Sequence, residues 1–114
     1  MPGQLDTLWT FALSFPGAFE DHPWEETPVV KVGKKVFVFF GTPDNPGISV
    51  KLPESAEQAR AVPDAAPMGY GLGRHGWVYV PVSRSTPVEL LQDWIEESYR
   101  AIATKKLVRE LDER

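Results

Sequence analysis

The sequence predicts a single α+β domain of two layers, with helices on an antiparallel sheet in the order α-β-β-β-α-β-β-α. Apolar residues near both ends of the chain recur at helical spacing, whereas the middle holds short runs of β-branched and aromatic residues. Eleven prolines and nine glycines, without a repeating period, separate these runs and mark turns. The length of 114 residues suits one domain, expected to span residues 1–114, and is too short for two ordinary ones.

The chain is expected to begin with an amphipathic helix. Its apolar stripe starts at Leu5 and includes Leu8, Trp9, Ala12 and Leu13, which lie on one helical face. Pro16 and Gly17 then end the helix. Residues 18–28 are rich in acidic side chains and are expected to form an irregular loop.

A three-stranded meander follows. The clearest hairpin has its strands at 29–32 and 35–40, joined by a two-residue turn of Gly33 and Lys34 that suits type II′ or I′. A second turn over 42–47 leads to a strand at 48–52, where apolar and polar residues alternate.

The second half of the chain predicts helix, two strands and helix. A short helix over 53–62 is closed by a proline, and a short strand near 68–72 precedes a stronger one at 77–82. The last helix is the most clearly marked, with Thr86 as a candidate N-cap and Pro87 at the first helical position.

Composition excludes several classes of function. The chain has no cysteine, so it forms no disulfide, thiolate metal site or iron–sulfur cluster. Its longest strongly apolar run, residues 36–40, is far shorter than the roughly 20 residues of a membrane helix. The N-terminus lacks the features of a secretory signal. We therefore expect a cytoplasmic protein that contacts no membrane.

Charge is distributed unevenly along the chain. The net charge is −4, which argues against a generally basic nucleic-acid binder. Two local basic groups remain: the lysines of the first hairpin and a C-terminal group of Arg100, Lys105, Lys106 and Arg109. Lysines at a hairpin turn can contact a phosphate backbone, or simply solvate the turn and protect a sheet edge. The C-terminal group is explained by the dipole of the last helix.

The strand pattern predicts two different sheet faces. One is aliphatic and suited to packing under helices: Val36, Val38, Phe40, Ile48, Val50, Leu52, Val78, Val80 and Val82. The other mixes aromatic residues with lysines: Lys35, Phe37, Phe39, Ser49, Lys51, Trp77 and Tyr79. This mixed face is either a stacking platform for bases or a surface covered by a helix or second subunit. Exposure of Phe37 and Trp77 distinguishes the two interpretations.

Other motifs give weaker signals. Residues 71–76 fit G-x-G-x-x-G, but a strand follows them where a dinucleotide site needs a helix. His22 lies among acidic residues without a metal-ligand spacing, and His75 has no recognisable catalytic partner. We expect no enzyme activity, no cofactor, no metal site and no small-molecule ligand.

Several short motifs, in order along nearly the whole chain, resemble the MmcQ/YjbR-like family. They include the helix end at 12–17 followed by acids and Trp24, the hairpin sequence at 33–37, the strand ending at Leu52, and the helix with Glu97, Ser98 and Tyr99. The resemblance implies a fold like that of secretion chaperones. It also implies DNA binding, because the family carries that label on account of a proposed pair of wing-like hairpins. This sequence departs from the family in placing Gly76 between His75 and Trp77, and in its acidic net charge.

The resemblance and the charge pattern together lead to one candidate site. Its nucleic-acid-binding residues are Lys34, Lys35, Lys51, Arg74 and Trp77, with lysines and arginine on phosphates and the indole in apolar or stacking contact. Binding is expected to be weak, salt-sensitive and little selective for base sequence. The alternative is a protein-interaction or chaperone-like module that buries its aromatic face against a partner or in a homodimer.

Overall fold

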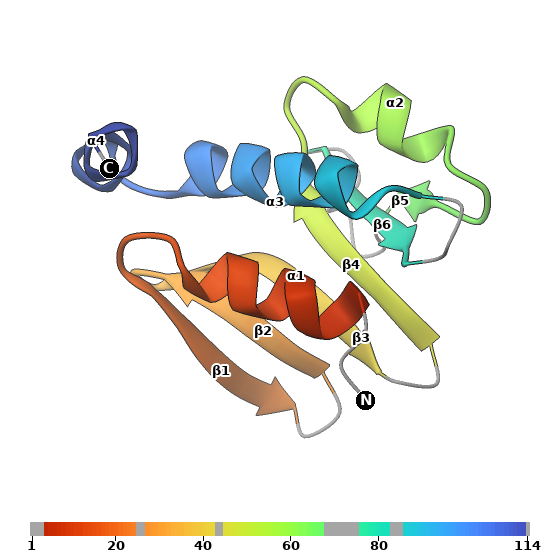
Figure 1. The fold of residues 1–114 in the computed structure, drawn as a ribbon, viewed down its shortest axis with the longest axis horizontal. Helices are drawn as coiled ribbons and strands as arrows, with labels where there is room; N and C mark the ends of the chain where they lie inside the picture. The colour runs from red at the N-terminus through yellow and green to blue at the C-terminus, as the bar shows by residue number, and fades with distance from the viewer. Residues whose placement is uncertain (1–3, 25–26, 43–44, 68–75, 83–85, 114) are drawn as a thin grey trace.

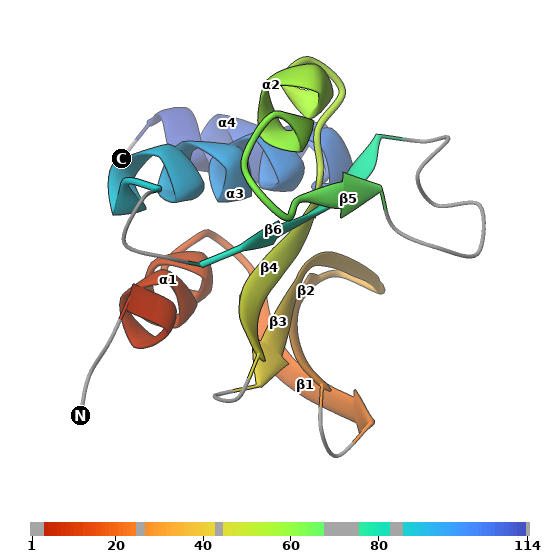
Figure 2. The ribbon, with the colours of Figure 1, turned by 90° about the vertical axis from the view of Figure 1, so that its right-hand side faces the viewer.

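Helices α1 and α3 lie side by side across one face of an antiparallel sheet in the computed structural model of the protein (Figures 1 and 2). The structure describes residues 4–24, 27–42, 45–67, 76–82 and 86–113. Within them the elements are, in order, α1 (Gln4–Leu13), β1 (Ala18–Trp24), β2 (Thr27–Val32), β3 (Lys35–Thr42), β4 (Asn45–Lys51), α2 (Ala56–Arg60), β5 (Ala66–Pro67), β6 (Trp77–Pro81), α3 (Val88–Ile102) and α4 (Lys105–Asp112). The sheet order is β1-β2-β3-β4-β6-β5.

The predicted α+β class and antiparallel sheet are confirmed, and the element order agrees with the prediction apart from two additions, with β5 in the place of the short strand expected near 68–72. The first addition is β1, where an irregular loop was expected. Residues from Ala18 to Asp21 pair with the β2 residues from Val29 to Val32. The acidic side chains of β1 have low strand propensity, so the sequence does not indicate a strand there. In the folded protein, pairing with β2 outweighs that propensity.

The second addition is α4, because the predicted last helix is broken. Ala103 and Thr104 are extended, and the Thr104 hydroxyl then caps α4 by accepting a bond from the Leu107 amide at 3.3 Å. At the other end, α3 begins at Val88, and Pro87 rather than Thr86 occupies the N-cap position. Lysines 105 and 106 therefore lie in the first turn of α4.

That position overturns the dipole explanation for half of the C-terminal basic group. Cations stabilise the last turn of a helix and are unfavourable in the first. Arg100 and Arg109 do lie in the last turns of α3 and α4, as expected. Lys105 and Lys106 do not, so their charge is not explained by helix stability.

The predicted hairpin turn is confirmed: Gly33 and Lys34 separate β2 from β3, and only Gly33 has a positive φ, at 64°, as in a II′ turn. Two predicted features fall outside the described residues, the centre of the second turn at 43–44 and the short strand near 68–72. Among the described residues, no helix is long and apolar enough to cross a membrane.

The core lies between the sheet and helices α1 and α3, and an aromatic cluster anchors it. Phe15 stacks on Tyr99 with ring centroids 4.7 Å apart, and Phe37 meets Tyr99 edge-to-face at 5.3 Å. Edge-to-face and offset pairs of this kind add about 0.5–1.5 kcal/mol each beyond the area that they bury. Phe37 is completely buried in this cluster, on the helix side of the sheet.

The location of Phe37 contradicts the prediction that it belongs to the mixed face. A β-bulge is the reason: Val30 pairs with Val38 but Lys31 pairs with Val36, so Phe37 is an extra residue in β3. A bulge interrupts the strict alternation of side chains. As a result Val36, predicted for the aliphatic face, instead lines a hollow beside Phe39.

Candidate functional site

The bulge in β3 also separates that strand from β4. The ladder between them runs through the pairs Phe40–Ile48, Phe39–Ser49 and Val38–Val50. The next pair in this register is Phe37 with Lys51, and there the bulged strand has bent away. Figure 2 shows the β2–β3 end of the sheet curling away from the upper part of β4.

A serine from α3 bridges this gap. The hydroxyl of Ser98 accepts a hydrogen bond from the Lys51 amide at 2.9 Å and donates one to the Phe37 carbonyl at 2.5 Å. Ser98 is completely buried, and its bond to Phe37 is fully enclosed, whereas its bond to Lys51 is partly buried. The side chain thus takes the place of a strand-to-strand bond and holds β3 and β4 apart.

A hollow of about 340 Å³ opens where the strands diverge. It is lined by the start of β3, the end of β4, the start of β6 and the end of α3: Lys35, Val36, Phe39, Lys51, Trp77, Ala101 and Ile102. Lys51 and Trp77 are direct partners in the β4–β6 ladder, which fixes their relative position. The lining contains two ammonium groups, five apolar side chains and no carboxylate.

Three of the five predicted site residues therefore meet in one place. Lys35, Lys51 and Trp77 line the hollow, and exposed Lys34 is next to Lys35 in the hairpin turn. Arg74 lies outside the described residues, so its part in the site stays a prediction. Within the described part of the chain, no acidic side chain pairs with Lys34, Lys35 or Lys51. Their charges are available to an anion.

The open stacking platform considered for the mixed face is not present. Phe37 is buried beneath the helices, and Trp77 is only 8% exposed. Trp77 packs edge-to-face on half-buried Phe39, with ring centroids 5.5 Å apart. The aromatic face that a homodimer was expected to bury is smaller for the same reason, since Phe37 is already inside the core.

Sequence reasoning missed three lining residues, Val36, Ala101 and Ile102. Val36 was assigned to the opposite face because strict alternation ignores the bulge. The two α3 residues have no chemical signature of a site. Their role becomes visible only when the end of the helix is placed beside the strands.

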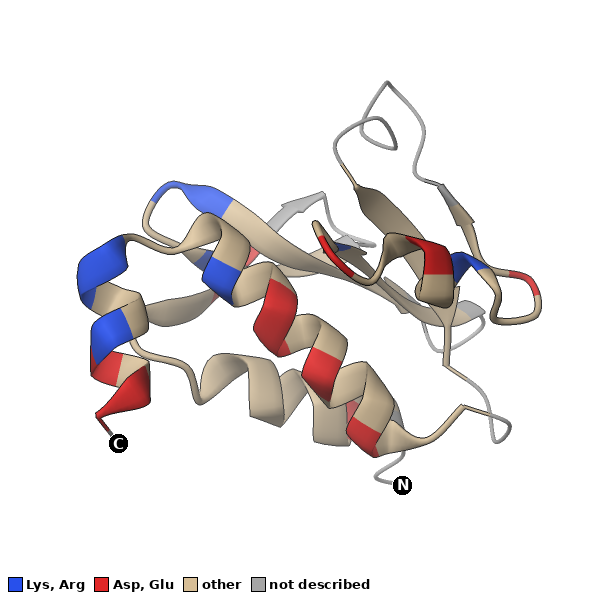
Figure 3. Ribbon diagram, turned by 90° about the horizontal axis from the view of Figure 1, so that it is seen from above, with Lys and Arg blue, Asp and Glu red and all other residues tan. Residues whose placement is uncertain are grey.

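Figure 3 shows how charge is arranged around this site. The basic segments of the hairpin turn and of the start of α4 lie at one end of the molecule, where the last turn of α4 also carries acidic positions, while further acidic segments follow α3 and α2 away from that end. The acidic positions on α3 are Glu89, Asp93, Glu96 and Glu97. The protein is acidic overall, yet it presents a cationic end.

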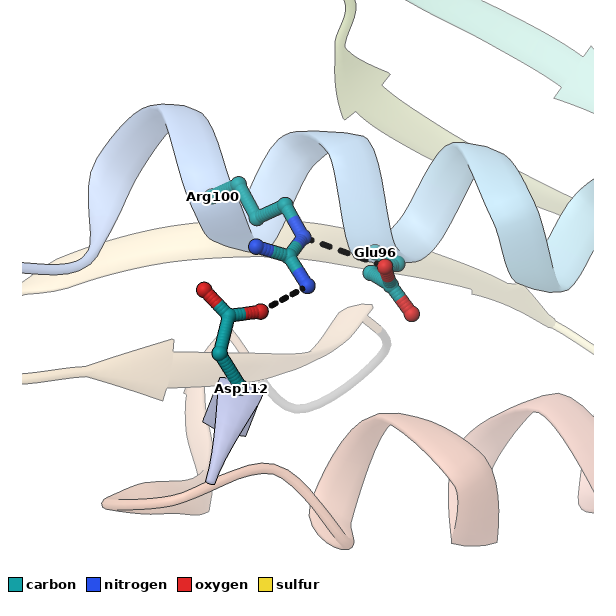
Figure 4. Close-up of polar contacts among 3 residues, drawn as sticks. All are labelled: Glu96, Arg100 and Asp112. Carbon is teal, nitrogen blue, oxygen red and sulfur yellow. Dashed lines mark hydrogen bonds and ion pairs between the residues drawn. The ribbon is translucent and has the colours of Figure 1, made fainter. Parts of the chain in front are cut away.

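An ion-pair cluster fixes α4 at that end. The Arg100 guanidinium donates to Glu96 at 3.0 Å and to Asp112 at 2.7 Å, which links the last turns of α3 and α4 (Figure 4). The bond from Arg100 holds the pKa of the Asp112 carboxyl below its ordinary value, and the same bond raises the pKa of Arg100. Since Arg100 is paired, it does not belong to the available cations.

The Glu97, Ser98 and Tyr99 motif has a structural role. Glu97 accepts bonds from the Glu54 and Ser55 amides, both at 3.0 Å, at the start of α2. Tyr99 donates to the Pro16 carbonyl at 2.7 Å, in the turn after α1. With Ser98 on the two strands, three consecutive residues attach α3 to three other parts of the fold.

The residues of the weaker chemical motifs lie largely outside what the structure describes. Among the described residues, no group of three or more His, Asp or Glu side chains could hold a metal ion. The residues 71–75 of the glycine motif, including His75, lie outside the described part of the chain. His22 falls within β1, although its side chain is not described.

Comparison with known proteins agrees with the resemblance seen in the sequence. The chain is similar to the crystal structure of Deinococcus radiodurans protein DR2400, which has a DUF419 domain, with 30% identity and a TM-score of 0.76. The similarity covers 98% of this chain and 92% of DR2400. No curated protein matches. The YjbR family profile matches residues 13–101, so the chain belongs to the YjbR family.

Proposed function

We propose that this protein binds nucleic acid through its cationic end, weakly and with little selectivity for base sequence. One observation carries the proposal: Lys35 and Lys51 border a hollow without a carboxylate, and no described acidic residue pairs with them or with Lys34. Lysines in such a setting attract phosphates. The proposal assigns a binding role and no catalytic step.

The location of Lys105 and Lys106 supports the same end of the molecule. Two cations in the first turn of α4 cost helix stability rather than add to it. Their basic segment lies at the same end as the hairpin turn (Figure 3). A phosphate backbone crossing this end would therefore meet the hairpin lysines first and the start of α4 beside them.

The magnitude of binding follows from the number of cations. Contacts from Lys34, Lys35 and Lys51 would contribute about −2.7 to the slope of log affinity against log salt for a duplex, before any contact from Lys105 or Lys106 is counted. Raising salt fourfold, from about 50 to 200 mM, would then weaken binding about 40-fold. Without a recognition helix that reads base edges, selectivity among duplex sequences should be small.

The test is fluorescence anisotropy of labelled single- and double-stranded oligonucleotides between about 50 and 200 mM salt. The double variant Lys34→Ala/Lys35→Ala should reduce the duplex slope by about 1.8, since each lost contact removes about 0.9. The matched control is Arg60→Ala, which removes one exposed cation from α2, at the other end of the molecule (Figure 1).

The control should keep the wild-type slope. Absence of binding at about 100 µM protein and 50 mM salt, where typical non-specific binders are at least half saturated, would overturn the proposal. An unchanged slope in the double variant would also overturn it, because the cations responsible would then lie elsewhere.

A further inference from the structure

We infer that the hollow between β3 and β4 takes one unstacked nucleobase, with its phosphate between Lys35 and Lys51. The inference rests on the proposed function, because it uses the same site. It adds the class of ligand, which is one nucleotide of an unpaired strand. A planar ring with an attached anion matches a lining of five apolar side chains and two ammonium groups.

Two other hollows on the protein show why this one is distinctive. The first, of about 330 Å³ near α1, includes the carboxylates of Asp6 and Glu20. The second, of about 440 Å³ between α3 and the start of α2, has one cation, Arg100, against four acidic side chains: Glu54, Asp93, Glu96 and Glu97. Both would repel a phosphate. Of these three hollows, the one beside Lys35 is therefore the one whose charge suits an anionic ligand.

The size of the hollow limits what can enter. A volume of about 340 Å³ is at the lower end of the range of roughly 300–1,000 Å³ for small-molecule sites. It has room for one ring system and not for a stack of bases. A base inside a duplex is stacked and paired, so an unpaired strand is the form that can supply a free base at low cost.

The walls of the hollow are held in place before any ligand arrives. Ser98 fixes the separation of β3 and β4 through its bonds to Lys51 and Phe37. The edge-to-face contact between Phe39 and Trp77 fixes the aromatic wall. Because little ordering is needed on binding, contact with the half-buried Phe39 ring should contribute to affinity.

The experiment compares three labelled oligonucleotides of equal length under identical salt: a thymine single strand, the same strand made fully abasic, and a duplex. A fourth arm titrates thymidine monophosphate, which separates a free nucleotide from a nucleotide within a strand. Stacking of one base corresponds to about 5- to 150-fold in affinity. We expect the thymine strand to bind at least about fivefold more tightly than the abasic strand.

Two variants test whether the hollow is responsible. Ala101→Leu adds a side chain at an exposed helical position on the wall and should bring the affinity ratio of the two strands close to one. Phe39→Leu removes the aromatic wall and should reduce the same ratio. The matched control, Ala61→Leu, adds the same side chain at an exposed position after α2 and should keep the wild-type ratio.

The outcomes separate this inference from the proposed function. Equal affinity for thymine and abasic strands would overturn the inference and leave electrostatic binding intact. A preference for thymine that Ala101→Leu does not change would also overturn it, because the base would be bound elsewhere. If no oligonucleotide binds but thymidine monophosphate does, and Ala101→Leu weakens it, the hollow is a mononucleotide site and the proposed function fails. If neither binds, both fail.

Discussion

Replacing Ser98 with alanine removes a single oxygen from the place where β3 and β4 diverge. That oxygen is the only connection that the described hydrogen bonds show between the Lys51 amide and the Phe37 carbonyl. Ser98 is completely buried, and no water can reach its position easily. The variant therefore leaves one backbone donor and one backbone acceptor without their partner.

The expected loss follows from these two groups. A buried polar group that loses its hydrogen bond costs about 1–3 kcal/mol. Lys51 is half-buried, so its amide belongs at the lower end of that range, whereas the Phe37 carbonyl is fully enclosed. We expect Ser98→Ala to lower the free energy of unfolding by about 2–4 kcal/mol, a large part of the 5–15 kcal/mol typical of a domain.

Urea denaturation at equilibrium measures this loss, and hydrogen exchange at the Lys51 amide locates it. The control is Ser14→Ala, which removes a hydroxyl whose 2.6 Å bond to the Phe11 carbonyl is at an exposed position. That variant should change stability by about 0.5 kcal/mol or less. A loss below about 0.5 kcal/mol for Ser98→Ala would refute the reasoning, because the strands would then have closed and bonded directly.

Three further predictions follow from polar contacts of α3 and α4. Tyr99→Phe should cost about 1 kcal/mol in urea denaturation, because it removes the 2.7 Å bond to Pro16 and keeps the ring; no change would show that the bond contributes nothing. Glu97→Ala should cost about 1 kcal/mol and speed amide exchange in α2 selectively, since the carboxylate acts there as a cap; uniform exchange across the fold would contradict this. Because Arg100 lowers the pKa of Asp112, their ion pair should persist above the ordinary carboxyl pKa and be lost as pH falls through the lower folded-state pKa. An NMR titration of the Asp112 carboxyl carbon should show this midpoint, and Arg100→Ala should return it to the ordinary value.

The parts of the fold that sequence predicts well are those where local pattern and tertiary packing agree. The hairpin at Gly33 is an example, because its turn chemistry and its flanking strands favour the same structure. The break at Thr104 shows the opposite case: apolar spacing continues through Ile102 to Leu107, and no proline or glycine interrupts it. Thr104 itself was the available signal, as a good N-cap residue.

The site was predictable in its charges and not in its shape. The sequence identified Lys35, Lys51 and Trp77 because basic and aromatic residues within strand segments can be recognised without a structure. The hollow depends on Phe37, which leaves the regular alternation to join Phe15 and Tyr99 in the core. That displacement is a tertiary effect, since residues far along the chain create it.

The separation of charge along the molecule has a kinetic consequence. At 0.01 M ionic strength the screening length is about 30 Å, close to the molecular dimensions of 35 × 33 × 27 Å. An approaching polyanion then interacts with the whole net charge of −4 and is repelled before it reaches the lysines. At 0.1 M the screening length is about 10 Å, so only the nearest end is felt. Encounter with a phosphate chain should therefore be fastest at intermediate salt, with the acidic N-terminal part of α3 turned away as the complex forms.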